Sequence, residues 1–124
     1  MERVDGIGGV FLTARDPDRL TAWYAEYLGV PPPPTSYDEP CWTPGAGETV
    51  FAVMPVGAEH FGGPEHTWSL NFRVPDLDAM VDQLRAAGID VTVDPETYPN
   101  GRFASLTDPE GNPLQLWQPG GVVG

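Results

Sequence analysis

A strand followed by an amphipathic helix is the first pattern along the chain. Residues 9–14 alternate as in a strand, and the alternation stops at Asp16 and Pro17. Aspartate caps a helix N-terminus, and proline suits the first helical position because its missing N–H costs nothing there. Apolar residues then recur at helical spacing until Gly29, where a left-handed helix end is expected. The members of this apolar stripe are Leu20, Trp23, Tyr24, Tyr27 and Leu28.

The same unit recurs in the second half of the chain. Residues 69–74 alternate, Asp76 is placed to cap a helix, and Gly88 is placed to end it. Asp76 lies 60 positions after Asp16, and Gly88 lies 59 positions after Gly29. The apolar face of the second helix consists of Leu77, Met80, Val81 and Leu84. A repeat at nearly fixed spacing predicts two similar structural modules.

Further strands complete each module. Residues 89–93 alternate, and residues 103–107 and 114–117 flank a tight turn at residues 108–112. In the first half, residues 49–54 are expected to form the closing strand and Trp42 a short one. We therefore expect a single α+β domain over residues 1–124. Its parts would be module one at about 6–54, a linker at about 55–67 and module two at about 68–119.

Composition narrows the range of partners and compartments. The formal net charge is −12, from 18 acidic residues against six arginines and no lysine, which disfavours nucleic acid and anionic membranes as partners. No apolar run approaches the roughly 18 residues of a membrane-spanning helix, and the N-terminus lacks the pattern of a secretion signal. Cys41 is the only cysteine, so no intrachain disulfide can form. A cytoplasmic protein is expected, with Cys41 as a buried, inert thiol.

The repeat and its motifs resemble a known superfamily. Asp16-Pro17 opens the first helix, Leu28-Gly29-Val30 closes it, and DPEGNPLQLW stands at residues 108–117. Together these resemble the vicinal oxygen chelate superfamily, whose members include glyoxalase I, extradiol dioxygenases, fosfomycin-resistance thiol transferases and bleomycin-binding proteins. The resemblance covers roughly residues 6–119. It implies two βαβββ modules that form a curved mixed sheet around a cavity, with the helices on the outer face.

The metal ligands of that superfamily are missing here. In metal-dependent members a His or Glu stands near the start of each module's first strand, and a Glu or comparable ligand stands in its last strand. The resemblance assigns these positions to Gly9 and Phe51 in module one and to Ser69 and Gln115 in module two. Glycine and phenylalanine offer no ligand, and Ser and Gln are weak neutral donors. We therefore expect neither a metal nor another cofactor.

Two histidines form an apparent alternative ligand set. His60 and His66 each follow a glutamate, but they lie in the expected linker with Gly62, Gly63 and Pro64 between them. No helix or strand would fix their spacing, so a surface linker is the favoured interpretation.

Strand alternation predicts which side chains face the cavity. Leu70, Phe72 and Val74 should pack on the helices, which leaves Ser69, Asn71 and Arg73 on the concave side. An apolar and aromatic cup with a few polar groups is typical of a small-molecule pocket. The candidate ligand-binding residues are Phe11, Thr13, Trp42, Phe51, Ser69, Asn71, Arg73, Tyr98, Arg102, Gln115 and Trp117.

Several functions fit this cup. Arg73 is suited to pair with an anion on a planar ligand, or else it reaches solvent or pairs with an acidic side chain. The first hypothesis is a metal-free ligand-binding protein, similar to drug-sequestering members of the superfamily. The alternatives are a metal-independent lyase, isomerase or cyclase, with Tyr98, Glu48 or Asp38 as acid or base, then a metal-dependent enzyme, and last a purely structural module. Relatives of this length commonly form twofold dimers, so a homodimer is expected.

Overall fold

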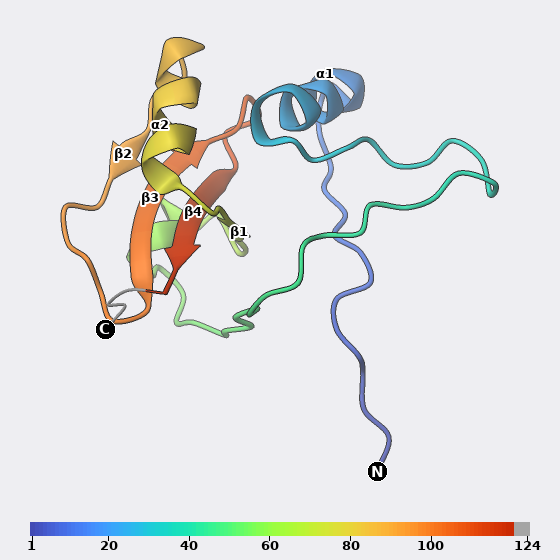
Figure 1. Ribbon diagram of the computed structural model, residues 1–124, viewed down its shortest axis with the longest axis horizontal. Helices are drawn as coiled ribbons and strands as arrows, with labels where there is room; N and C mark the ends of the chain where they lie inside the picture. Colours follow the sequence, from blue (N-terminus) through green and yellow to red (C-terminus); the bar gives the residue numbers. More distant parts are fainter. Residues whose placement is uncertain (121–124) are drawn as a thin grey trace.

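The second half of the chain forms a complete βαβββ module. The computed structural model describes residues 1–120. After β1 (Leu70–Arg73) come α2 (Leu77–Ala86), β2 (Thr92–Val93), β3 (Gly101–Thr107) and β4 (Pro113–Pro119). The sheet order is β1-β4-β3-β2, with β1 parallel to β4 and the other pairs antiparallel. The mixed sheet and the α+β class predicted from the sequence are confirmed (Figure 1).

Both predicted helices form, and their ends are where the sequence signals place them. Asp16 accepts a hydrogen bond from the backbone N–H of Arg19, and Asp76 accepts one from Ala79. The first helix consists of α1 (Pro17–Trp23) and a π-helical continuation, η1 (Tyr24–Leu28). It ends at Gly29, whose φ of 72° is in the left-handed region.

The expected strands of the first module are absent from the sheet. Among residues 1–120, no strand precedes β1, so the strand predictions for residues 9–14, for Trp42 and for residues 49–54 are wrong for a single chain. Alternation gives a segment the side-chain pattern of a strand, but a ladder also needs a partner edge for its backbone N–H and C=O groups. The strand expected at residues 89–93 is also shorter than predicted, since only Thr92–Val93 form β2. The linker contains a short 3-10 helix, η2 (Glu59–Phe61).

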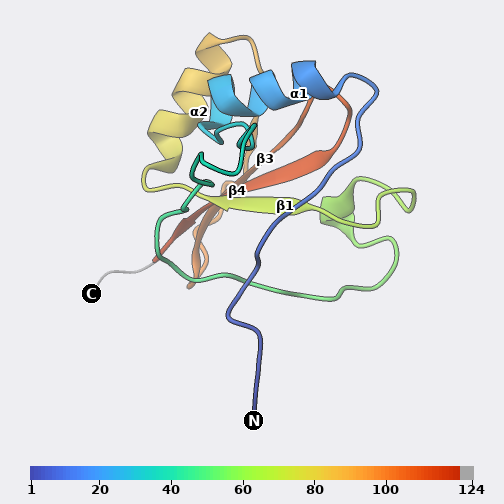
Figure 2. The same ribbon diagram turned by 90° about the vertical axis from the view of Figure 1, so that its right-hand side faces the viewer.

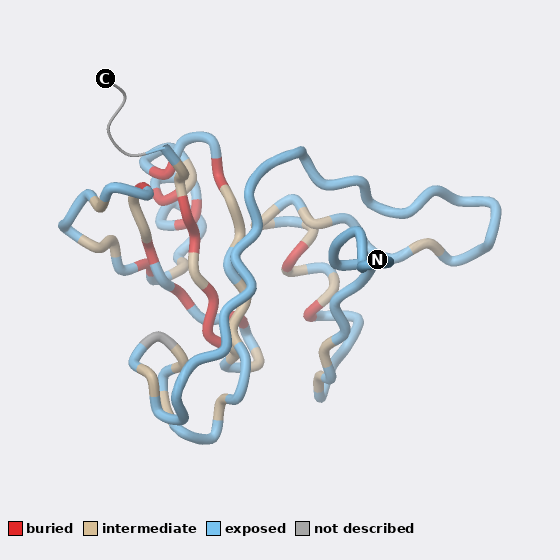
Figure 3. The backbone as a smooth tube through the Cα atoms, turned by 90° about the horizontal axis from the view of Figure 1, so that it is seen from below, coloured by how far each residue is buried: buried red, intermediate tan, exposed pale blue. Residues whose placement is uncertain are grey.

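The helices cover one face of the sheet only. In Figures 1 and 2, α1 and α2 lie above the sheet, and the N-terminal segment and the green segment before β1 run below it. Buried residues follow the strands and helices, whereas the N-terminal segment and the segment between η1 and η2 are almost entirely exposed (Figure 3). The core between helices and sheet consists of Leu20, Tyr24, Val74, Leu77, Val81, Leu84, Val91, Ala104, Leu106, Leu114 and Leu116. None of the helices in the described part of the chain is long and apolar enough to cross a membrane.

Candidate functional site

The sheet face turned away from the helices carries the predicted polar and aromatic side chains. Leu70, Phe72, Leu114 and Leu116 pack in or against the core, so alternation turns their neighbours to the opposite side. The strand register aligns Asn71 with Gln115 and Ser105, and Arg73 with Trp117 and Phe103. We call this side the open face; it consists of Asn71, Arg73, Phe103, Ser105, Gln115 and Trp117.

Hydrogen bonds fix the polar row of the open face. The Asn71 amide donates to Oε1 of Gln115 at 2.7 Å, which joins β1 to β4. Just before β1, the Ser69 hydroxyl donates to the carbonyl of Pro113 at 3.3 Å. Asn71 and Ser105 are exposed, so this row is open to a ligand with hydrogen-bonding groups.

The aromatic part of this face is packed rather than open. Trp117 is only 5% exposed, and its indole N–H donates to the carbonyl of Asn100 at 2.8 Å. Its ring lies parallel to that of Phe103, with centroids 6.3 Å apart, and Tyr98 contacts Phe103 edge-on. Tyr98 donates to Asp94, and this hydrogen bond raises the pKa of the phenol. The predicted role of Trp117 as a stacking surface therefore requires the turn at residues 98–101 to move.

The two candidate arginines lie on opposite sides of the sheet. The Arg73 guanidinium donates to the carbonyls of Gly45 and Glu48 on the open-face side. Arg102 instead pairs with Asp78 of α2 at 3.0 Å, and this ion pair raises the pKa of Arg102 and lowers that of Asp78. Arg102 therefore belongs to the helix side and is not brought together with Arg73.

The candidate residues of the first module are mostly in solvent. Phe11 is 93% exposed, Phe51 84% and Trp42 49%, so none of these rings is packed in a single chain. Thr13 lies instead in an open hollow beside Glu110. Cys41 is exposed, so its predicted burial is wrong, because residues 31–58 lie outside the core.

The residues at the family's metal positions do not fit a divalent metal. Gly9 and Phe51 offer no side-chain ligand atom, and the Ser69 hydroxyl and Oε1 of Gln115, both neutral, take part in the hydrogen bonds given above. Among the side chains that the structure describes, which do not include that of His60, no three from His, Cys, Asp or Glu come together in a way that could hold a metal ion. This chain therefore departs from the family's metal-binding pattern, because the residue types at the ligand positions are poor ligands for a divalent metal.

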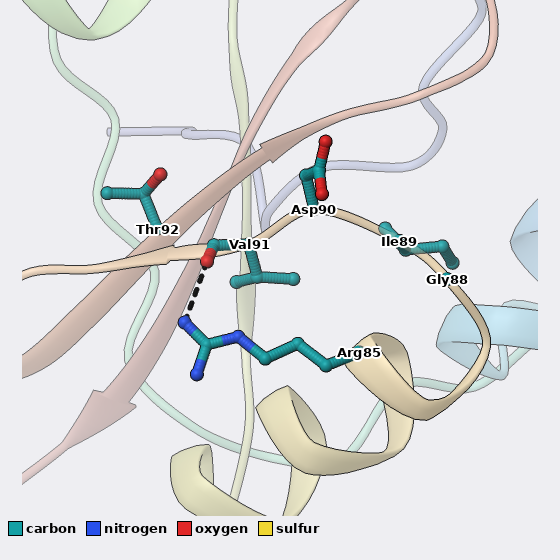
Figure 4. Close-up of a pocket in the computed structure, with 6 residues that line it drawn as sticks. All are labelled: Arg85, Gly88, Ile89, Asp90, Val91 and Thr92. Atoms are coloured by element: carbon teal, nitrogen blue, oxygen red, sulfur yellow. Dashed lines mark hydrogen bonds between the residues drawn. The ribbon is translucent and has the colours of Figure 1, made fainter.

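Another hollow lies between the end of α2 and β2 (Figure 4). The Arg85 guanidinium reaches across it and donates to the carbonyl of Val91 at 2.9 Å. Asp90 points away from the guanidinium in Figure 4. This arrangement ties the helix to the strand and offers no convergent set of polar groups to a ligand.

The DPEGN turn, which the sequence predicted as a hairpin turn and as part of the family motif, has a further structural role. Asp108 is buried and accepts hydrogen bonds from the Tyr24 hydroxyl at 2.7 Å and from the Asn112 amide at 2.7 Å. Glu110 accepts the backbone N–H groups of Arg15 and Asp16, just before α1. The turn thus fastens the first helix to the second module. Two carboxylates within a five-residue turn were the available signal, because a plain hairpin needs neither.

Comparisons with known proteins assign the class and then the family. A βαβββ module with a helix-free face carrying polar groups defines the chain as a small α+β domain of the glyoxalase-like kind. Residues 6–116 match the sequence profile of the Glyoxalase/Bleomycin resistance protein/Dioxygenase superfamily. The chain belongs to this superfamily, as its motifs predicted.

Three relatives illustrate the breadth of the family. TnmS3, an antibiotic binding protein from Streptomyces sp. CB03234, is similar in structure, with a TM-score of 0.60 and 25% identity; the match covers 96% of this chain and 99% of TnmS3. A glyoxylase/bleomycin resistance protein/dioxygenase domain from Frankia sp. EAN1pec has a TM-score of 0.59 at 21% identity, over 94% of this chain and 99% of that one, and supports the fold alone. "Putative glyoxylase CFP32" of Mycobacterium bovis is 32% identical over 79 residues, which are 63% of this chain and 30% of the relative. The match thus spans about a third of that curated protein.

Proposed function

We propose that this protein binds a small planar molecule at the open face without a metal. The observation that carries the proposal is a sheet face not covered by α1 or α2, on which a hydrogen-bonded amide pair, Asn71 and Gln115, lies beside a packed aromatic cluster. A helix-free face with a few fixed polar groups next to aromatic rings has the chemistry of a small-molecule site. The likeness to an antibiotic binding protein over nearly the whole of both chains supports ligand binding rather than turnover.

The proposal includes a second copy of the chain. Phe11, Phe51 and Val53 are each more than four-fifths exposed, on segments with the alternation of strands but without partners. One edge of β1 is also unpaired, so the chain presents both a free strand edge and unpaired strand-like segments. A twofold pair in which each copy's first-module segments cover the other's open face would bury these apolar side chains and enclose the ligand. Cytoplasmic location is proposed with it, since the exposed free Cys41 suits a reducing compartment.

A pair of tryptophan substitutions tests where the ligand binds. Gln115→Trp fills the open face, whereas Gln83→Trp makes the same change on an exposed position of α2. Equilibrium dialysis would use a panel of aromatic antibiotics together with 2-naphthoate and 2-naphthalenemethanol. We expect Gln115→Trp to weaken binding by about tenfold or more, because the added ring occupies the site, and Gln83→Trp to leave it unchanged.

The contrary result is equal binding by both variants, which would move the site away from the open face. Far-UV circular dichroism identifies folded protein, and Asn71→Trp provides a second substitution on the same face if Gln115→Trp does not fold.

A further inference from the structure

Arg73 ends β1 on the open face, and its guanidinium binds backbone rather than an acid. Nη1 donates to the carbonyl of Glu48 at 2.5 Å and approaches the hydroxyl of Thr49 at 3.4 Å. Nη2 donates to the carbonyl of Gly45 at 2.7 Å. Within the described part of the chain, no carboxylate is among its hydrogen-bond or ion-pair partners. We call residues 45–49, which these bonds hold against the end of β1, the strap.

Glycine at position 47 leaves room for the guanidinium in the place that it occupies. A Cβ on Gly47 would lie 2.6 Å from Nε and 3.0 Å from Cζ of Arg73, closer than real Cβ atoms approach a neighbour. The φ of Gly47 is not in the left-handed region, so a side chain at this position would meet no backbone strain but would have to displace the guanidinium. At Gly45, by contrast, a Cβ would meet nothing within 4 Å. The backbone of the strap therefore sits directly on Arg73 at Gly47.

We propose that Arg73 is a positioning residue that fastens the strap as one wall of the ligand site. The guanidinium directs one N–H of each Nη atom at a strap carbonyl, and the strap backbone at Gly47 lies against Nε. A ligand carboxylate would therefore compete with the strap for this side chain. It follows that the ligand is recognised without an ionic contact to Arg73 and is neutral at that end. The role of the strap as a wall rests on the proposed function, whereas its attachment to Arg73 does not.

Proteolysis of the intact protein tests the attachment without any ligand. A Glu-specific protease attacks the carbonyl carbon of Glu48, and Arg73 donates to the oxygen of the same carbonyl group. Release of the strap should raise the rate of cleavage after Glu48 by about tenfold or more, since charge-assisted hydrogen bonds protect that bond. We expect this increase in Arg73→Gln and also in Gly47→Ala, which displaces the guanidinium but keeps its charge.

The matched controls are Gly45→Ala, an identical change in open space on the same strap, and Arg102→Gln, which removes an arginine from the other side of the sheet. Both variants should be cleaved after Glu48 at the same rate as the unmodified protein. Rates are normalised to cleavage after Glu26 in the first helix, so that general unfolding is recognised. An unchanged rate in Arg73→Gln or Gly47→Ala, or an equal increase in Gly45→Ala, would overturn the attachment.

A pair of ligands that are similar in shape but differ in charge tests the recognition. If Arg73 only positions the strap, Arg73→Gln and Gly47→Ala should each weaken the binding of 2-naphthoate and of 2-naphthalenemethanol by the same factor, within about twofold. If Arg73→Gln lost affinity for 2-naphthoate alone, Arg73 would recognise charge, and this part of the inference would be overturned. If the unmodified protein binds neither compound nor any antibiotic of the panel, the proposed function fails, and the proteolysis result alone decides the attachment of the strap.

Discussion

Tyr24 and Asp108 join the two halves of the chain through one buried hydrogen bond. The phenol comes from the first helix and the carboxylate from the turn before β4, 84 positions apart. Burial, and then the hydrogen bond to Asp108, raise the pKa of Tyr24 well above its usual range. The folded protein therefore keeps a proton on Tyr24 at a pH where an unfolded chain would lose it.

This raised pKa predicts a loss of stability at alkaline pH. The stabilisation that Tyr24 gives the folded state is fully present below the unfolded tyrosine pKa of about 10. It falls as the pH rises above that value, because the unfolded state then binds fewer protons than the folded state. Near neutral pH, the free energy of unfolding of Tyr24→Phe should be lower by about 1–3 kcal/mol, because the hydrogen bond to a buried carboxylate is missing. Between about pH 8 and about pH 11, the free energy of unfolding of this variant should then decline less steeply than that of the unmodified protein. Denaturant unfolding at several pH values measures both effects.

The control for this prediction is Tyr37→Phe, since Tyr37 is fully exposed. Tyr98, whose pKa is raised by its hydrogen bond to Asp94, is present in every variant and cancels from the comparison. If stability declines equally steeply in the unmodified protein and in Tyr24→Phe, Tyr24 is not the group responsible.

Among the elements, the helices and the second-module strands could be predicted because their signals are local. Asp16 and Asp76 cap the helices within three residues, and residues 103–107 and 114–117 pair across a short turn. The strands of the first module could not be placed by the same means, because alternation does not say which edge a segment pairs with.

The candidate site was predictable in part for the same reason. Alternation along β1 and β4 correctly placed Asn71 and Gln115 on one face, because successive side chains of a strand point to opposite faces of the sheet. The engagement of Arg73 by the Glu48 carbonyl, 25 positions away, depends on how a segment without regular structure crosses the sheet. The burial of Trp117 likewise depends on the turn at residues 98–101, which no periodicity describes.

The unpaired segments predict an effect on assembly. Phe51 is 84% exposed within residues 49–54, and we propose that this segment packs on a second copy. Phe51→Asp should therefore weaken the dimer by about tenfold or more, because it puts a charge into an apolar contact. Sedimentation velocity over a concentration series measures the change.

Tyr37→Asp is the matched control, since it places the same charge at an exposed aromatic residue outside the alternating segments. A monomeric unmodified protein, or equal sedimentation of all three proteins, would contradict the proposed pairing.

At the scale of the whole molecule, we propose a ligand site that works without a metal. The net charge of −12 comes from acids spread along the chain, and no three of them meet at one point among residues 1–120. Of the six arginines, Arg15, Arg73, Arg85 and Arg102 are bound to groups of the protein itself. With Arg73 held by the strap and Trp117 buried, the exposed groups of the open face that could contact a ligand are neutral and polar.

Calorimetric titration of chelator-treated protein with the aromatic panel tests this account most directly. We predict that at least one compound binds with a dissociation constant below about 100 µM, and that added zinc or manganese changes this constant by no more than about twofold. Binding that appears only after metal is added, or the failure of every compound to bind, would contradict the account.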